Sequence, residues 1–431
     1  MKRGHLSEYI TGVVVKRLSA VEVDPGTSNQ HEFNGSVDLK RLLGEGDRKN
    51  IPTRFLWIDG EQASSDAIEG SISWYDARRR HPTRSEYRLY YQGNAVTRLM
   101  RAEDSFFLAM RNDGEGLVVI TPTGGTMFNQ LLWLFGLDES PLFQFTYTPV
   151  EGNRDAELDF AARVILEALG IEPEEPEAAL LDRLIEPYGL KMPRPEELST
   201  LARLSVGKEA AIDDPDDALL RWMDRETQLF RRIERRLVAD RIASGFGSQG
   251  QEDVDGFIKF SLSVQNRRKS RAGLALESHI EALLKANSID YSRGAITENG
   301  NRPDFLFPSS EAYQDSSFPN EKLLMLGAKS TLKERWRQVL SEAERIPHKH
   351  LLTLEPGISE AQTDEMRAKC LQLVLPRDLH RTYKPAQQAW LIGVRDFLAL
   401  AKAVPSYPSC ACGACARGGR GGVCAGGCSA G

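Results

Sequence analysis

Arg302-Pro-Asp-Phe-Leu-Phe-Pro308 and Leu323-Leu-Met-Leu-Gly-Ala-Lys329 are the two stretches that decide the fold of the C-terminal half of the chain. Each is a short apolar run bounded by proline or a charged residue, which is typical of a buried strand. Asp304 opens the first strand and Lys329 closes the second. If the strands are neighbours, the aspartate and the lysine can project to one point.

Glu342 lies thirteen residues beyond Lys329, on a predicted helix. Together with Asp304 it can complete a Mg²⁺ site, because this ion prefers a few hard oxygen ligands and leaves the remaining positions to water and phosphate. Such a site can hydrolyse phosphodiesters, with the lysine orienting or activating the attacking water. A turn aspartate after proline and a solvated lysine would give the same spacing, so the spacing alone leaves both interpretations open.

Glu277 is a further acid on a predicted helix over 272–286. It shares a helical face with three apolar residues, so we expect it to point toward the body of the domain: Leu274, Ile280 and Leu284. An uncompensated carboxylate is strongly disfavoured there, and a nearby metal would offset that cost.

Helical and strand patterns alternate around these residues, which predicts an α/β domain with a central mixed sheet over 210–404. Further helices are expected at 219–242, 332–345, 360–369 and 386–403, and strands at 304–307, 323–329, 350–354 and 371–375. The N-terminal 1–140 is mostly β, with strands expected at 12–18, 54–58, 71–75, 86–91, 105–110 and 116–120. Between these two regions, the segment 141–209 is acidic and has a helical pattern interrupted by prolines. We interpret it as a linker region.

The composition bounds the class of protein. With 431 residues and 41% hydrophobic content, the chain can bury more than one core, and no apolar run is long enough for a bilayer span. No secretory signal is apparent, so a cytoplasmic location is expected. The net charge of −6 argues against wholesale polyanion binding, but an arginine-rich helix over 219–242 and the run at 266–271 form a local basic patch.

The cysteines indicate no disulfide framework, because Cys370 is alone and the other five lie in the last twenty-two residues. The tail over 405–431 is rich in Ser, Gly, Cys and Ala, and we expect it to be disordered. Two Cys pairs could in principle bind Zn²⁺, but a non-functional extension is the favoured interpretation.

The stretch from about 214 to 398 resembles the catalytic domain of EcoRII-type restriction endonucleases of the PD-(D/E)-x-K superfamily. The resemblance rests on six segments of the sequence: Ser263-Val-Gln-Asn-Arg-Arg-Lys-Ser-Arg-Ala-Gly, Leu276-Glu-Ser-His, Arg302-Pro-Asp-Phe-Leu-Phe-Pro, Lys329-Ser-Thr-Leu-Lys-Glu-Arg-Trp-Arg-Gln, Ser341-Glu-Ala-Glu-Arg-Ile and His350-Leu-Leu-Thr-Leu. It implies that Asp304 binds metal, Lys329 is the catalytic lysine, Glu342 is the acid displaced onto a helix, and Glu277 is the acid of the preceding helix. Gly327 replaces the usual second acid, as is typical of this subgroup.

Lys333, Glu334 and Arg335 resemble the segment with which such enzymes read paired cytosine and guanine. Arg or Lys can donate to guanine, and Glu can accept from cytosine. Thr331-Leu-Lys-Glu334 is also a plain capping box, so both roles stay open. The basic residues Arg267, Arg268 and Lys269 are further candidate DNA contacts.

The N-terminal region resembles the effector DNA-binding domain of the same enzymes, a pseudobarrel, on Lys16-Arg-Leu-Ser-Ala, His31-Glu-Phe-Asn-Gly and Arg88-Leu-Tyr-Tyr. Candidate contacts are Lys16, Arg17, Asn34 and the basic run of Arg78, Arg79, Arg80 and Arg84, with Trp74 and Tyr75 beside this run. For Arg78 to Arg80, a solvated loop explains the sequence equally well.

The resemblance implies a Mg²⁺-dependent type II restriction endonuclease that cuts double-stranded DNA at a short GC-flanked site. A homodimer would supply one active site for each strand, and the N-terminal domain would bind a second copy of the site and regulate cleavage. A cognate DNA methyltransferase is the expected partner in a restriction-modification system. The alternative is a non-catalytic, sequence-specific DNA-binding regulator that retains the fold.

Overall fold

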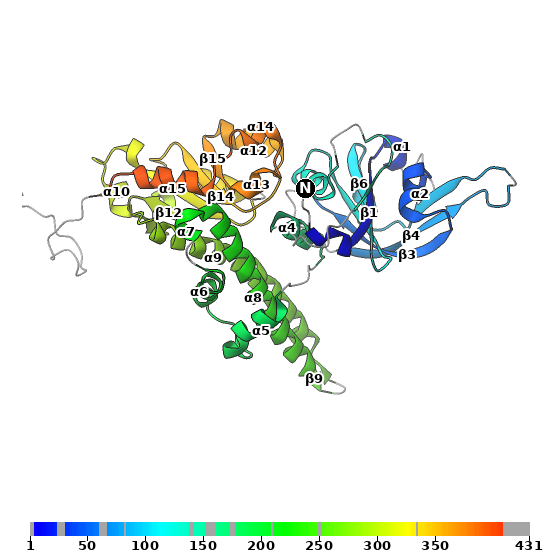
Figure 1. Cartoon of the computed structure of the whole chain (residues 1–431), viewed down its shortest axis with the longest axis horizontal. Helices are drawn as coiled ribbons and strands as arrows, with labels where there is room; N and C mark the ends of the chain where they lie inside the picture. Colours follow the sequence, from blue (N-terminus) through cyan, green and yellow to red (C-terminus); the bar gives the residue numbers. More distant parts are fainter. Residues whose placement is uncertain are drawn as a thin grey trace, which may run out of the picture.

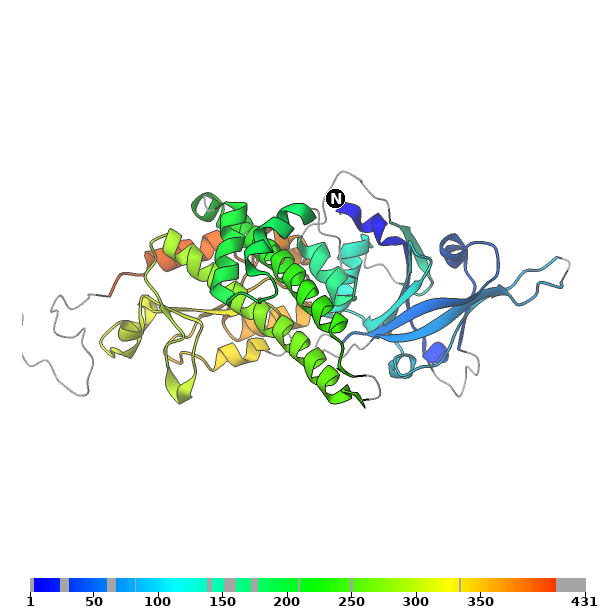
Figure 2. The same ribbon diagram turned by 90° about the horizontal axis from the view of Figure 1, so that it is seen from below.

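The computed structural model describes residues 4–23, 31–59, 67–81, 83–137, 142–150, 160–171, 177–207, 210–248, 251–332 and 335–407. They form an N-terminal β-sheet body, a long helical hairpin and a C-terminal α/β body, and the hairpin projects away from both bodies (Figure 1). Figure 2 shows the two bodies at opposite ends of the molecule. Within these ranges no helix combines the length and the apolar character that a membrane crossing would need.

The N-terminal body is built on an eight-stranded sheet with the order β2-β5-β4-β3-β7-β6-β1-β8. Neighbouring strands are antiparallel except β3 and β7, which are parallel. All six strands expected from the sequence are present, and two short edge strands add to them. The strands are β1 (Ile10–Arg17), β2 (Glu32–Asn34), β3 (Arg48–Trp57), β4 (Ile68–Asp76), β5 (Tyr87–Tyr91), β6 (Asp104–Arg111), β7 (Gly116–Pro122) and β8 (Thr146–Pro149).

Both faces of this sheet are covered. In β1, Val13 and Val15 join a core cluster with α3 (Thr126–Phe135) and α4 (Phe160–Ala168), whereas Val14 joins a second cluster that includes α2 (Val37–Leu43). Burial on both faces explains why the strands appear in the sequence as nearly continuous apolar runs.

The helical hairpin consists of α8 (Pro215–Ala243) and α9 (Val254–Ala286). The prediction of a long helix over 219–242 is confirmed by α8. The prediction that the next helix begins near residue 272 is wrong, because α9 begins at Val254. Its first turns leave Val254, Phe257 and Leu262 more than half exposed, so they lack the buried apolar face by which a helix is recognised in a sequence.

Two helices of the predicted linker region pack against α8. Leu181 of α5 (Ala178–Ile185) and Leu198 of α6 (Pro195–Val206) share a small core with Leu229, Phe230 and Ile233 of α8. A short helix, α7 (Ala210–Asp213), leads into α8.

The C-terminal body contains a mixed five-stranded sheet with the order β11-β12-β13-β14-β15. The first three strands are antiparallel and the last three parallel. This agrees with the α/β domain and mixed sheet predicted from the sequence. The elements are β11 (Ser292–Arg293), β12 (Phe305–Phe307), α10 (Ser310–Gln314), β13 (Leu324–Lys329), α11 (Trp336–Leu340), β14 (Lys349–Thr353), α12 (Glu360–Ala368), β15 (Leu371–Val374), α13 (Arg377–His380), α14 (Pro385–Gln388) and α15 (Val394–Ala403).

Two helix predictions in this body need correction. The helix expected over 332–345 is reduced to α11, because the chain turns after Leu340 and Ala343 adopts a left-handed conformation with φ of 50°. The helix expected over 386–403 is split into α14 and α15, because Ile392 between them forms a β-bridge with Val374.

Candidate active site

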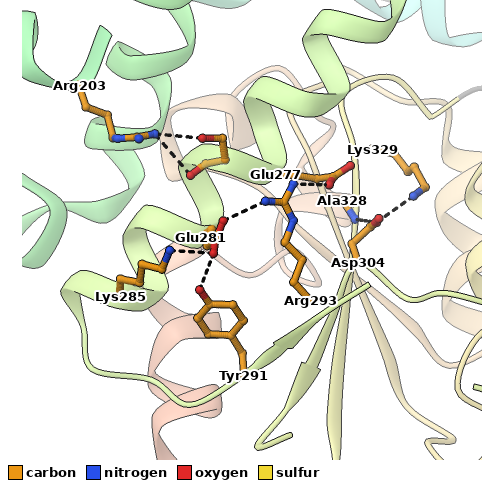
Figure 3. Close-up of polar contacts among 10 residues, drawn as sticks. Arg203, Glu277, Glu281, Lys285, Tyr291, Arg293, Asp304, Ala328 and Lys329 are labelled. Carbon is orange, nitrogen blue, oxygen red and sulfur yellow. Dashed lines mark hydrogen bonds and ion pairs between the residues drawn. The ribbon is translucent and has the colours of Figure 1, made fainter. Parts of the chain in front are cut away.

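Asp304 and Lys329 meet at one end of the C-terminal sheet. β12 and β13 are antiparallel with Phe305 opposite Leu326, so the residue that opens β12 lies beside the end of β13. Asp304 Oδ2 accepts hydrogen bonds from the Ala328 backbone N–H at 2.7 Å and from Lys329 Nζ at 2.8 Å (Figure 3). The strand ends predicted from the sequence therefore come together.

Glu342 belongs to the same cluster, although it lies in the turn after α11 and not on a helix as predicted. Its backbone N–H donates to the Val339 carbonyl at 3.2 Å. Burial raises the pKa of Glu342 to about 7, Lys329 opposes the shift, and Asp304 adds to it. Among the described residues Glu342 Oε2 is buried without a hydrogen-bond partner.

Glu277 approaches the cluster from α9. Its side chain, 24% exposed, forms an ion pair with Arg293 of β11 at 2.8 Å. Figure 3 shows it projecting from α9 toward the ends of β12 and β13. The expected shared face is only partly correct, since Ile280 is buried but Leu274 is 41% exposed.

The carboxylates of this cluster fit a hard divalent cation. In the part of the chain that the structure describes, no three His, Cys, Asp or Glu side chains form a preorganised metal site. A Mg²⁺ ion, however, is commonly held by only one or two carboxylates plus water and phosphate oxygens. Asp304 and Glu342 supply two carboxylates, and Glu342 Oε2, which has no hydrogen-bond partner among the described residues, can serve as a metal ligand.

The predicted recognition segment is described only in part, because Lys333 and Glu334 lie outside the described residues. Arg335 is exposed, and its N–H donates to the Leu332 carbonyl at 2.7 Å. The Leu332 N–H is held in turn by the carboxylate of Glu355, a residue that the sequence analysis missed. Glu355 follows β14, which is the neighbour of β13, so its position after a strand was the available signal.

The basic patch predicted on the hairpin is largely neutralised within the chain. Arg268 contacts the buried Glu234 of α8 at 2.5 Å, whereas Arg267 is partly exposed and the Lys269 side chain is not described. On α8, Arg231 pairs with Glu167 at 2.6 Å. Three further pairs follow the same pattern: Arg232 with Asp182, Arg236 with Asp182, and Arg271 with the buried Glu226.

The N-terminal candidates lie on the eight-stranded sheet and its loops and are also paired. Lys16 contacts Glu22, Arg17 contacts Glu103 at 3.2 Å, and Arg79 contacts Asp47 at 2.9 Å. Asn34 accepts from Arg88, and both residues line a surface pocket of about 560 Å³. Trp74 is fully buried in the core, so only Tyr75 of the two aromatic candidates is partly accessible.

Arg293 and Glu281 are further residues near the cluster that the sequence analysis missed. They lie twelve residues apart on β11 and α9 and meet only after folding, at 2.9 Å. No local pattern in the sequence identifies such a pair.

The chain is similar in sequence to known proteins over most of its length. A family model for the EcoRII C terminal matches residues 230–398. The chain is 43% identical over 397 residues to the type II restriction enzyme EcoRII of Escherichia coli, covering 90% of this chain and 93% of that protein. It is 32% identical over 110 residues to the type II restriction enzyme SsoII of Shigella sonnei, covering 23% of this chain and 35% of SsoII.

Among solved structures, metal-depleted Ecl18kI in complex with uncleaved, modified DNA aligns with a TM-score of 0.40 at 19% identity. That alignment covers 52% of this chain and 81% of Ecl18kI. The identity with EcoRII extends over nearly the full length of both proteins. The chain therefore belongs to the EcoRII family of type II restriction enzymes, which are DNA-hydrolysing endonucleases.

Proposed function

We propose that the chain cuts double-stranded DNA with Mg²⁺ held by Asp304 and Glu342. The observation that carries this proposal is the buried, unpartnered Glu342 Oε2 beside the Asp304–Lys329 pair. When bound, the ion would polarise a phosphoryl oxygen and lower the pKa of a coordinated water.

The residues of the chain would do the remaining work. The Ala328 N–H and Lys329 Nζ fix the Asp304 carboxylate, because both donate to the same oxygen. The Lys329 side chain is 20% exposed, so its ammonium group can contact a water or a phosphate oxygen while it stays bonded to Asp304. Glu277, paired with Arg293, would contribute a further carboxylate from α9 on the opposite side of the site.

We further propose that residues 333–335 read a short GC-flanked site and that a homodimer supplies one active site per strand. The N-terminal body would bind a second, effector copy of the site. The contact between the two bodies supports regulation: Gln130 of α3 donates to the Pro356 carbonyl at 2.7 Å, next to Glu355, which holds Leu332. A cognate methyltransferase would protect the host site.

The experiment that tests catalysis is a plasmid nicking assay with Asp304→Ala. Cleavage in Mg²⁺ should be abolished, whereas specific DNA binding in Ca²⁺ or EDTA should stay largely intact. Asp364→Ala on the exposed face of α12 is the matched control and should cut normally. Cleavage by Asp304→Ala at near the wild-type rate would contradict the proposed active site. A wild-type chain that binds DNA but never cuts it would favour the non-catalytic regulator.

The domain division is a second proposal: 1–140 as effector domain, 141–209 as connecting region, 210–404 as catalytic domain and 405–431 as tail. The packing of α5 and α6 on α8 supports an earlier start for an autonomous catalytic fragment, near Glu177. A fragment 177–407 should therefore fold and cut DNA. A fragment 210–407 should be less stable because it exposes Leu229, Phe230 and Ile233, and equal melting temperatures of the two fragments would contradict this boundary.

A further inference from the structure

A chain of ion pairs runs along α9 and β11 to the candidate active site. Lys285 contacts Glu281 at 2.8 Å, Glu281 contacts Arg293 at 2.9 Å, and Arg293 contacts Glu277 at 2.8 Å (Figure 3). The Tyr291 hydroxyl also donates to Glu281 at 2.8 Å. One guanidinium therefore bridges two carboxylates, of which only Glu277 points toward the catalytic cluster.

The backbone of Arg293 is attached to the strand that carries the catalytic aspartate. Arg293 pairs with Phe305 in the antiparallel β11–β12 ladder, and the next residue, Gly294, donates its N–H to the Asp304 carbonyl at 3.1 Å. Any position that Arg293 imposes on Glu277 is therefore defined relative to Asp304.

The side chain of Arg293 is held by two hydrogen bonds. One terminal nitrogen donates to Glu281 and the other to Glu277. The planar guanidinium, with several N–H donors in fixed directions, is suited to bind two carboxylates at once. Glu281 is itself held by Lys285 and Tyr291. Glu281 thus acts as a brace: by binding the Arg293 guanidinium, it limits the rotamers that Arg293 can adopt when Glu277 moves.

An unheld Glu277 would disturb the catalytic cluster. A glutamate on a helix surface has several accessible rotamers, and an unpaired carboxylate near Lys329 would compete with Asp304 for the ammonium group. Pairing with Arg293 offsets the charge of Glu277 and leaves Lys329 to Asp304.

We infer that Arg293 is a positioning residue that sets the Glu277 carboxylate beside the proposed metal site, with Glu281 as its brace. This inference rests on the proposed function, and it assigns Arg293 an effect on metal affinity and on the rate of cleavage that is exerted through Glu277. Removing a partner that orients a metal-site carboxylate typically costs about 10–100-fold in metal affinity or activity.

The test uses the full chain and measures the Ca²⁺ concentration that half-saturates specific DNA binding, together with cleavage in Mg²⁺. Arg293→Gln should raise the half-saturating Ca²⁺ concentration about 10-fold and slow cleavage about 10–100-fold. Arg293→Lys should recover part of both losses because it keeps the charge. Lys285→Gln is the matched control: it also removes a partner of Glu281, but Lys285 is 66% exposed, so both readouts should stay near wild type.

A double mutant separates positioning from general damage to the fold. In a Glu277→Gln background, Arg293→Gln should cause no further change in the half-saturating Ca²⁺ concentration, because the residue through which it acts is already gone. An additional loss equal to that in the wild-type background would overturn the inference, and so would an Arg293→Gln protein with normal Ca²⁺ dependence.

Further outcomes keep the inference testable if Arg293→Gln does not fold, and distinguish it from the proposed function. If Arg293→Gln does not fold, Glu281→Gln provides the test, since it removes the brace while the Glu277–Arg293 pair remains. This variant should raise the half-saturating Ca²⁺ concentration by a smaller factor than Arg293→Gln would. An unchanged Ca²⁺ concentration would overturn the inference. If Asp304→Ala still cuts DNA, the proposed function fails. If Asp304→Ala is inert and Arg293→Gln is fully active, only the role of Arg293 fails.

Discussion

The β12–β13 side of the candidate site and its α9–β11 side each contain two carboxylates, but the two sides differ in how these are compensated. On the α9–β11 side, Glu277 and Glu281 are matched by Arg293 and Lys285. On the other side, Lys329 pairs with Asp304, whereas Lys329 and Lys349 act on Glu342 only through their charge, and Glu342 Oε2 is buried without a hydrogen-bond partner among the described residues.

This difference indicates where a cation would bind. A buried carboxylate without a partner is unfavourable, and the raised pKa of Glu342 is the expected response to burial. The α9–β11 side is already balanced and gains less from a cation. We therefore expect substitutions on the β12–β13 side to affect chemistry most.

After the loss of cleavage expected for Asp304→Ala, the largest effect should come from Lys329→Ala. Turnover should fall by about 10²–10⁴-fold, as is usual when a group that moves or orients a proton is lost, while the DNA sequence bound in Ca²⁺ stays the same. Single-turnover cleavage and a binding titration measure the two quantities. Lys322→Ala, an exposed lysine before β13, is the control, and a Lys329→Ala protein that cuts normally would break the comparison between the two sides.

Arg335, which follows β13, and Arg268, which lies on α9, should also differ when they are replaced by alanine. Arg335 is exposed just after β13, so Arg335→Ala should weaken specific binding by about 1–3 kcal/mol and leave stability nearly unchanged. Arg268 on α9 pairs with the buried Glu234, so Arg268→Ala should lower stability instead. Competition binding and denaturant unfolding of both variants provide the check, and unchanged sequence discrimination in Arg335→Ala would leave this residue with a structural role alone.

Much of the fold could be predicted because local patterns determine it. The strands β6 and β7 are continuous apolar runs bounded by turn residues, and α8 has an extended helical pattern. The first half of α9 could not be predicted, since it buries no apolar stripe. The break between α14 and α15 also depends on a distant contact, the bridge from Ile392 to Val374.

The candidate site followed partly from local patterns. Asp304 and Lys329 were proposed from strand ends, and Glu342 and Glu277 from predicted helices, and the resemblance implied roles for all four. The role of the hairpin arginines could not be inferred from local charge, because their partners lie far along the chain: Glu167 is 64 residues before Arg231, and Asp182 is 50 before Arg232. A basic run in a sequence indicates a DNA-binding surface only when no acidic segment folds against it.

The smallest effect we predict concerns the pH dependence of stability in the metal-free protein. Because burial raises the pKa of Glu342 from 4.5 to about 7, the folded chain binds more protons at this residue than the unfolded chain between these pH values. The free energy of unfolding should therefore fall as pH rises through this window. Glu342→Gln removes the titrating group, so at pH 8 it should be more stable than wild type by on the order of 1–2 kcal/mol.

Glu277→Gln supplies the contrast for this prediction. Its carboxylate is paired with Arg293, so its removal breaks an ion pair and should give no gain in stability at pH 8. Denaturant unfolding in EDTA at pH 5, 6, 7 and 8 measures both variants against wild type. A stabilised Glu277→Gln together with an unaffected Glu342→Gln would reverse the assignment, because the uncompensated charge, and with it the place for a cation, would then lie on the α9–β11 side.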